Sequence, residues 1–226
     1  MSLFDLNKRK EEIAKVKASL PYRSKYLATH FKKIESLEKD LHRVPSKDEF
    51  IFLQSAASFN AFTFIPFIAK PYHIEHLYAT TYSISRRVID AIMELYDDGM
   101  VASVTLLISD SMIKRNPQTI DNLLAMQSTR ANVEVLFGWI HAKVALAKTA
   151  DNHFVVEGSG NWSENAKYEQ YTFAESRGLF EFRKELFAVT EIRYKTVKGK
   201  LIPVNQCIKN YLKHLYLYFM IHLNQY

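Results

Sequence analysis

Hydrophobic and polar residues follow two different periods along the chain, one typical of helices and one typical of strands. Near the N-terminus, apolar residues recur every three or four positions, which predicts helices over Leu3–Leu20 and Ser24–Leu41 with a break at Pro21. We interpret residues 1–45 as a helical N-terminal extension. The same period in Asn205–Leu223 predicts a C-terminal helix, which either docks on the core or pairs two protomers.

The remaining part, residues 46–226, alternates short apolar runs with amphipathic segments and is interpreted as the main domain. The apolar runs predict strands, at Ile74–Ser85, Val101–Ser109, Asn132–Trp139, His153–Glu157 and Tyr171–Ala174. The segments between them predict helices, at Arg86–Tyr96, Pro117–Met126 and Leu179–Phe187. Because strands that alternate with helices form βαβ units, we expect an α/β fold with a mixed, largely parallel sheet flanked by helices.

Three segments are less regular. Ser46 and Glu49 have the spacing of a capping box, which predicts a short helix or turn over Asp48–Gln54. The phenylalanine-rich segment Ser55–Ile68 could stack on nucleobases, but a buried strand or core packing is far commoner for such a run. Val197–Pro203 is expected to be a connector.

Composition narrows the class of protein. The 226 residues are 48% hydrophobic and 24% charged, which is typical of a folded domain, and a single cysteine excludes an internal disulfide. The net charge of +6 favours an anionic partner such as nucleic acid. The first residues do not resemble a signal peptide, and the apolar run Leu215–Ile221 is too short to span a bilayer. We therefore expect a cytoplasmic protein without stable membrane insertion.

The strongest chemical signal begins at His141. On a strand, His141 and Lys143 would point to one face, while the residues between and after them pack on the other. A polar turn and a second short strand then lead to the glycine-rich sequence Gly158-Ser159-Gly160-Asn161. Its backbone N–H groups, hydroxyl and carboxamide can surround a phosphate oxygen, so an imidazole, an ammonium, a hydroxyl and an amide are expected to converge.

This combination resembles the signature of the phospholipase D superfamily, His-x-Lys followed by Gly-Ser-x-Asn. Here the signature is His141-Ala142-Lys143 and Gly158-Ser159-Gly160-Asn161. Glu169 is similar to the carboxylate that orients the histidine in the small bacterial nucleases of this family. Many members also carry an acidic residue five positions after the lysine, where this chain has Lys148. The resemblance implies a phospholipase D-like α/β domain.

The resemblance also assigns catalytic roles. It implies that His141 attacks phosphorus to form a phosphohistidine, and that Glu169 holds the imidazole in the required tautomer. Lys143, Ser159 and Asn161 would bind the nonbridging oxygens, where charge accumulates. The scheme needs no metal ion and no cofactor.

Three further residues are expected to contact the substrate. Gly158 and Gly160 belong to the phosphate-binding turn, and Trp162 either stacks on a base or walls the pocket, of which the wall is favoured. The leaving oxygen requires a proton, and superfamily members obtain it from a second copy of the motif. Only one copy is visible in this sequence, so the resemblance implies a homodimer in which two His141 side chains face one another.

The resemblance and the basic charge together favour a metal-independent phosphodiesterase of nuclease type that cleaves DNA or RNA. A phospholipid-hydrolysing enzyme is an alternative, because the same kind of site cleaves phospholipid diesters. A catalytically inert nucleic-acid-binding module is another, since Lys148 replaces the motif acid. A generic interaction protein is the fourth interpretation.

Overall fold

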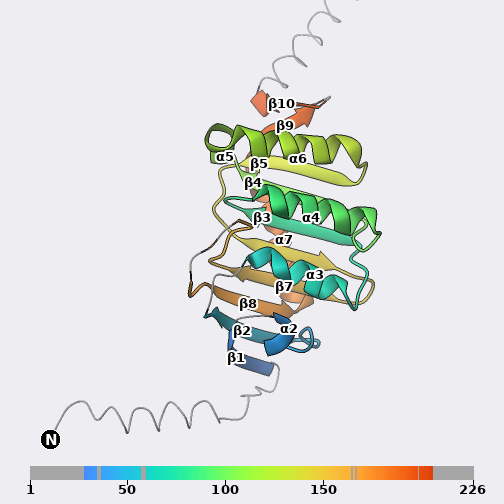
Figure 1. Ribbon diagram of the computed structural model, residues 1–226, viewed down its shortest axis with the longest axis vertical. Coiled ribbons are helices and arrows are strands. Elements are labelled where there is room, and N and C mark those ends of the chain that lie inside the picture. The colour runs from blue at the N-terminus through green and yellow to red at the C-terminus, as the bar shows by residue number, and fades with distance from the viewer. Residues whose placement is uncertain are drawn as a thin grey trace, which may run out of the picture.

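The computed structural model describes residues 28–34, 37–56, 60–163, 165, 167–197 and 199–205. In this part of the chain, one ten-stranded mixed sheet is flanked by helices, which confirms the α/β class (Figure 1). The helix expected over Leu3–Leu20 lies outside the described residues, as does the one over Asn205–Leu223 except for its first residue. Among the described residues, no helix is both long enough and apolar enough to cross a membrane.

The sheet runs in the order β1-β2-β8-β7-β6-β3-β4-β5-β9-β10. The strands in chain order are β1 (Ala28–Ile34), β2 (Glu49–Ser55), β3 (His76–Thr81), β4 (Val104–Ser109), β5 (Val133–Gly138), β6 (Val144–Lys148), β7 (His153–Gly158), β8 (Gln170–Glu175), β9 (Ile192–Val197) and β10 (Lys200–Pro203). The helices are α2 (Leu37–Asp40), the 3-10 helix η1 (Ala61–Thr63), α3 (Phe64–Ala69), α4 (Arg86–Asp97), α5 (Ser111–Arg115), α6 (Pro117–Thr129) and α7 (Arg177–Val189).

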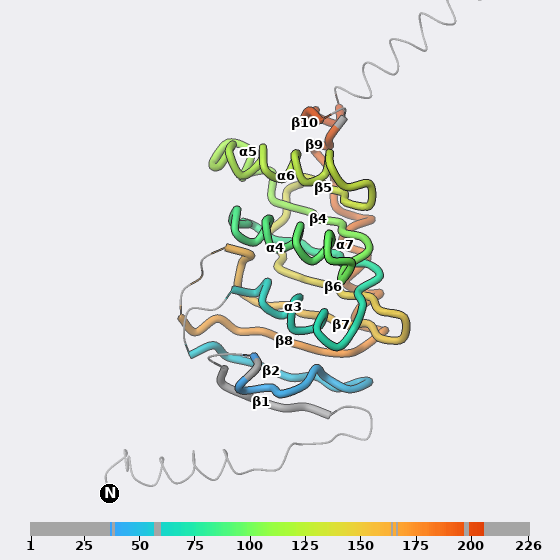
Figure 2. The backbone as a smooth tube through the Cα atoms, turned by 45° about the vertical axis from the view of Figure 1, so that its right-hand side comes forward, coloured from blue at the N-terminus to red at the C-terminus, as the bar shows by residue number. Residues whose placement is uncertain are grey.

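The two faces of the sheet are covered differently. Helices α3, α4 and α6 lie over one face and α7 over the other (Figure 2). The alternation of side chains along β6 shows the division, because Ala145 packs in the larger core with α4 and α6, whereas Leu146 packs in the smaller core with Phe180 of α7. Each core residue of β6 therefore belongs to one layer only.

The expectation of a largely parallel sheet is wrong. In the described sheet, parallel pairing occurs only between β1 and β2, β3 and β4, and β4 and β5, and the other neighbouring strands are antiparallel. The cause lies in the connections, since β6, β7 and β8 follow one another without the helical crossovers that parallel neighbours need. The connections between strands decide whether neighbours are parallel or antiparallel, and the apolar runs in the sequence do not.

Two expected helices are wrong as well. Residues Ala28–Ile34 of the expected helix Ser24–Leu41 form β1, which pairs with β2. The short helix or turn expected over Asp48–Gln54 is a turn only at Asp48, and the residues from Glu49 onward belong to β2, in which alternate residues are buried. Half of the expected capping box does form, because the Ser46 backbone N–H donates to the Glu49 carboxylate at 2.6 Å, but the chain then continues as a strand.

Other expectations are confirmed with shifted ends. Ser85 caps α4, and its hydroxyl accepts a hydrogen bond from the Val88 backbone N–H. The strands β3 to β5 and the helices α4, α6 and α7 occupy the predicted segments. The expected core packing of Ser55–Ile68 is confirmed for Phe62 and Phe64, which are buried, although they lie in η1 and α3 and not in a strand. The connector expected at Val197–Pro203 is a hairpin of β9 and β10.

The pairing registers bring the predicted motif to one edge of the sheet. Thr80, at the carboxyl end of β3, lies opposite Val144, the first residue of β6. Val144 lies opposite Glu157 near the end of β7, and Gly158 lies opposite Tyr171 at the start of β8. The parallel strands β3 to β5 and the antiparallel strands β6 to β8 therefore meet where the motif is located.

Candidate active site

His141 and Lys143 lie side by side immediately before β6. Lys143 Nζ is 3.2 Å from His141 Nδ1 and donates to the His141 backbone carbonyl at 2.9 Å. The segment is anchored by the buried Thr80 hydroxyl, which donates to the Ala142 carbonyl and accepts from the Val144 backbone N–H. The imidazole and the ammonium thus meet on the exposed side of a backbone that β3 holds in place.

Tyr82, just beyond β3, contacts the imidazole. Its ring centroid is 4.7 Å from that of His141, and Lys143 Nζ lies 5.8 Å from the Tyr82 centroid. Arg115 places its guanidinium carbon 4.4 Å from the same centroid and donates to the hydroxyl of Ser111. Sequence reasoning missed Tyr82 and Arg115, although the position of Tyr82 after the carboxyl end of a strand was a usable signal.

The glycine-rich turn lies against the motif because its backbone is bonded on both sides. The Gly158 N–H donates to the Lys143 carbonyl at 3.2 Å, and the Ser159 N–H donates to the Gln170 carbonyl at 3.0 Å. A Cβ atom at Gly158 would lie 2.9 Å from Tyr171 Cδ1, and one at Gly160 would lie 2.9 Å from Tyr171 Cζ. Glycine is therefore required at both positions by the close approach of β8.

Glu169 is linked to the turn through Ser159, whose hydroxyl donates to the Glu169 carboxylate. The backbone of Glu169 is fixed by the end of β2, since its N–H donates to the Ser55 hydroxyl at 2.9 Å and its carbonyl accepts from the Ser55 N–H at 2.8 Å. Within the described residues, the carboxylate bonds to Ser159 and not to His141. The predicted orienting role of Glu169 remains a prediction.

Asn161 and Trp162 form the end of the turn. The Asn161 backbone N–H donates to the Asn165 side-chain oxygen at 2.9 Å, which turns the chain inward. Asn161 Oδ1 is buried and has no hydrogen-bond partner in the described part of the chain. Trp162 is only 2% exposed and packs edge-to-face on Phe62, with ring centroids 5.3 Å apart. A ring buried in this way forms a wall and offers no free face to a base.

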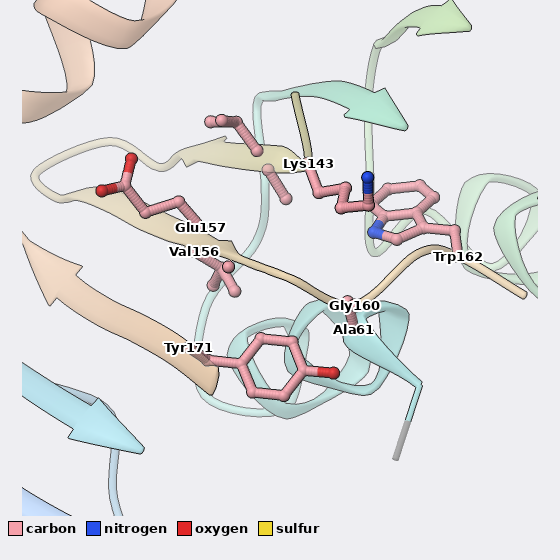
Figure 3. A pocket seen from close by; sticks show the side chains of 10 residues that line it. Ala61, Lys143, Val156, Glu157, Gly160, Trp162 and Tyr171 are labelled. Atoms are coloured by element: carbon pink, nitrogen blue, oxygen red, sulfur yellow. The ribbon is translucent and has the colours of Figure 1, made fainter. Parts of the chain in front are cut away.

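A small recess opens between the motif and the turn. Its lining includes Lys143, Gly158, Gly160, Trp162 and Tyr171. Figure 3 shows Lys143 and Trp162 on one side of Gly160 and the Tyr171 ring on the other. The recess is therefore lined both by a cation, Lys143, and by the glycine-rich turn.

Burial shifts the pKa values of two side chains that line the recess. Desolvation lowers the pKa of Lys143 below its ordinary value of 10.5, and the nearby Glu169 and Tyr82 oppose that shift. Desolvation raises the pKa of Tyr171, and the negative charge of Glu169 raises it further, so the phenol stays protonated. A partly desolvated ammonium beside a neutral phenol favours an anionic ligand, because the anion would restore the charge stabilisation that Lys143 has lost.

Lys148, which replaces the motif acid, lies at the far end of β6 from His141 and Lys143. It is ion-paired with Glu75 at 2.5 Å. Lys148 is five positions along the chain from Lys143, which corresponds to about 17 Å in a strand. Lys148, the position at which the sequence differs from the superfamily signature, is therefore remote from the recess. No three or more His, Cys, Asp or Glu side chains in the described part of the chain group together in a way that could hold a metal ion.

No family model and no curated protein matches this chain. Solved structures that are similar to it include TrmBL2, an archaeal chromatin protein that binds DNA, at 12% identity and a TM-score of 0.43 over 82% of this chain and 61% of that one. Phosphatidylserine synthase of Haemophilus influenzae is 15% identical, with a TM-score of 0.45 over 68% of this chain and 38% of that one. Polyphosphate kinase of Porphyromonas gingivalis is 12% identical, with a TM-score of 0.35 over 68% and 25%. The chain spans less than two thirds of each protein, and likenesses this remote carry no functional argument.

Proposed function

We propose that the chain is a metal-independent phosphodiesterase of nuclease type, which cleaves DNA or RNA through a phosphohistidine. The observation that carries this proposal is the contact between the Lys143 ammonium and the His141 imidazole, beside the glycine-rich turn that the motif of the phospholipase D superfamily requires. Lys143, the Ser159 hydroxyl and the backbone of the turn would hold the nonbridging oxygens of the diester.

In the first step, His141 Nε2 attacks phosphorus, the bond to the leaving oxygen breaks, and that oxygen takes a proton from an acid. The attack needs a ring whose proton is on Nδ1. An ammonium can only donate, so the contact of Lys143 with Nδ1 leaves the proton on Nε2. Binding of a phosphate would draw Lys143 away from the ring, which would lose its Nε2 proton to solvent, take one from solvent on Nδ1 and donate that Nδ1–H to Glu169. This exchange links substrate binding to activation of the nucleophile.

In the second step, water attacks the phosphohistidine, the phosphorus–nitrogen bond breaks and His141 is restored. The group that gave its proton to the leaving oxygen now accepts one from the water. In the proposed homodimer this group is His141 of the partner subunit. The chemistry thus demands two copies of the chain, and a protein that sediments as a strict monomer while it cleaves DNA would contradict this part of the proposal.

A second candidate is a catalytically inert nucleic-acid-binding module. The contacts of the described residues favour it in one respect, because Glu169 bonds to Ser159 and Lys143 bonds to the ring nitrogen that should face Glu169. In such a module the same residues would bind phosphate without turnover. Tight and salt-sensitive binding of DNA without cleavage would distinguish it from the hydrolase.

The test is cleavage of labelled single-stranded and duplex DNA, RNA and phospholipid vesicles in excess EDTA. We expect nucleic acid to be cleaved by the wild type and not by His141→Ala, and rapid denaturation at alkaline pH to trap a phosphoprotein whose phosphate is then released by acid. The matched control is His73→Ala, since His73 is exposed and precedes β3 at the opposite edge of the sheet. Full activity in His141→Ala would overturn the proposal, and vesicle hydrolysis without nucleic-acid cleavage would favour the lipid alternative.

A further inference from the structure

Two aromatic side chains at the edge of the sheet that carries the motif are unusually exposed. Trp139 is 73% exposed and Tyr168 is 70% exposed, more than any other large aromatic residue in the described part of the chain. Trp139 lies two residues before His141, and Tyr168 lies immediately before Glu169. Because β5 ends at Gly138 and β8 begins at Gln170, both rings lie at the edge of the sheet that carries the motif.

Exposure of this extent is unusual for tryptophan, which is normally well buried, as Trp162 is. Burial of aromatic surface is favourable at about 25 cal/mol per Å², so an open ring beside a functional site is suited to covering by a ligand. Trp139 also lies next to a cation. The Arg193 guanidinium carbon is 5.5 Å from its ring centroid, and Arg193 is held there by Asp110 at 3.1 Å.

A flat ring, an adjoining guanidinium and a recess lined by the Lys143 ammonium match the chemistry of a nucleotide strand. The ring can stack on a base, while the cation faces the backbone phosphate of the same strand. A lipid head group offers the phosphate but no flat ring. A duplex offers both, but its bases are stacked on one another and present only their edges in the grooves.

We propose that Trp139, assisted by Arg193, is a stacking platform for a base of single-stranded nucleic acid, and that Tyr168 receives a base on the other side of the recess. The inference rests on the proposed function, whose substrate it specifies. The strand would cross His141 with its scissile phosphate in the recess and bases on either side, so unpaired DNA or RNA is bound in preference to a duplex.

The chain offers a direct readout because it has two tryptophans, and only Trp139 is exposed. The emission of His141→Ala protein is recorded while a twelve-residue oligothymidine is added, and the titration is repeated with an abasic oligomer of equal length and with a duplex. We expect oligothymidine to quench the exposed tryptophan and the other two probes to quench it little. Trp139→Ala should weaken oligothymidine binding, measured by anisotropy, by about 5- to 150-fold.

The matched control is Phe182→Ala, because Phe182 is 59% exposed but lies on α7. The proposal is overturned if the two variants bind oligothymidine alike, or if the abasic oligomer or the duplex quenches as strongly. Failure of the proposed hydrolase is a separate result: the wild-type protein would bind oligothymidine through Trp139 but would not cleave it in EDTA.

Discussion

Replacement of Gly158 by alanine tests whether the close approach of β7 to β8 holds the glycine-rich turn. The added Cβ would lie 2.9 Å from Tyr171 Cδ1 and closer still to the Gln170 carbonyl oxygen, whereas real Cβ atoms essentially never come within 3.0 Å of another group. The strands must separate, which would strain the bond from Ser159 N–H to Gln170 at 3.0 Å. Overpacking and a weakened backbone bond together should lower the free energy of unfolding by about 2–4 kcal/mol.

The control for this substitution is Gly178→Ala. Gly178 lies in α7, and a Cβ there would meet no atom within 4 Å. Alanine should therefore stabilise the protein by about 0.5–1 kcal/mol, because glycine is unfavourable inside a helix. Urea unfolding of the two variants and the wild type, followed by circular dichroism, measures both changes. If Gly158→Ala is as stable as the wild type, the reasoning from the close approach is refuted.

Three further predictions concern charged groups. Lys143→Met should abolish cleavage and raise the free energy of unfolding slightly. The pKa of Lys143 in the folded state lies below 10.5, so the stability of the wild type should rise as the pH is raised toward 10.5. Urea unfolding of Lys143→Met should show a smaller rise over the same pH range. Lys148→Asp, which restores the superfamily acid, should not raise the cleavage rate and should lower the urea midpoint, because it sets a second carboxylate against Glu75. Desolvation and the nearby Lys184 lower the pKa of His76 below 6.5, so that on acidification the unfolded state binds a proton before the folded state does. The free energy of unfolding should therefore fall below about pH 6.5, and it should fall less in His76→Phe.

The helices and the central strands could be predicted because their apolar periods are long and their caps are local. Ser85 and Gly99 delimit α4 through contacts within the helix and its ends. The segment Ala28–Ile34 could not be assigned in this way, because apolar residues at three- and four-residue steps within a short strand also fit a helix. Its pairing with β2 decided the outcome, and that pairing is a tertiary contact that no local pattern reveals.

The candidate site was predictable as far as its residues are close in sequence. The spacing of His141 and Lys143 and the return through the hairpin to Gly158 are local features, and the structure brings them together. The contact of Tyr82 with His141 could not be predicted in the same way, because it depends on the order of strands in the sheet.

The last strand of the described sheet leaves one side of its backbone unpaired, which is the usual starting point for aggregation through added strands. In β10 this hazard is blunted by its own sequence, since Lys200 is exposed and charged and Pro203 has no N–H to offer. Fibril growth from this border is therefore disfavoured. Replacement of Pro203 by a β-branched residue would remove that protection and should shorten the lag time in a thioflavin assay.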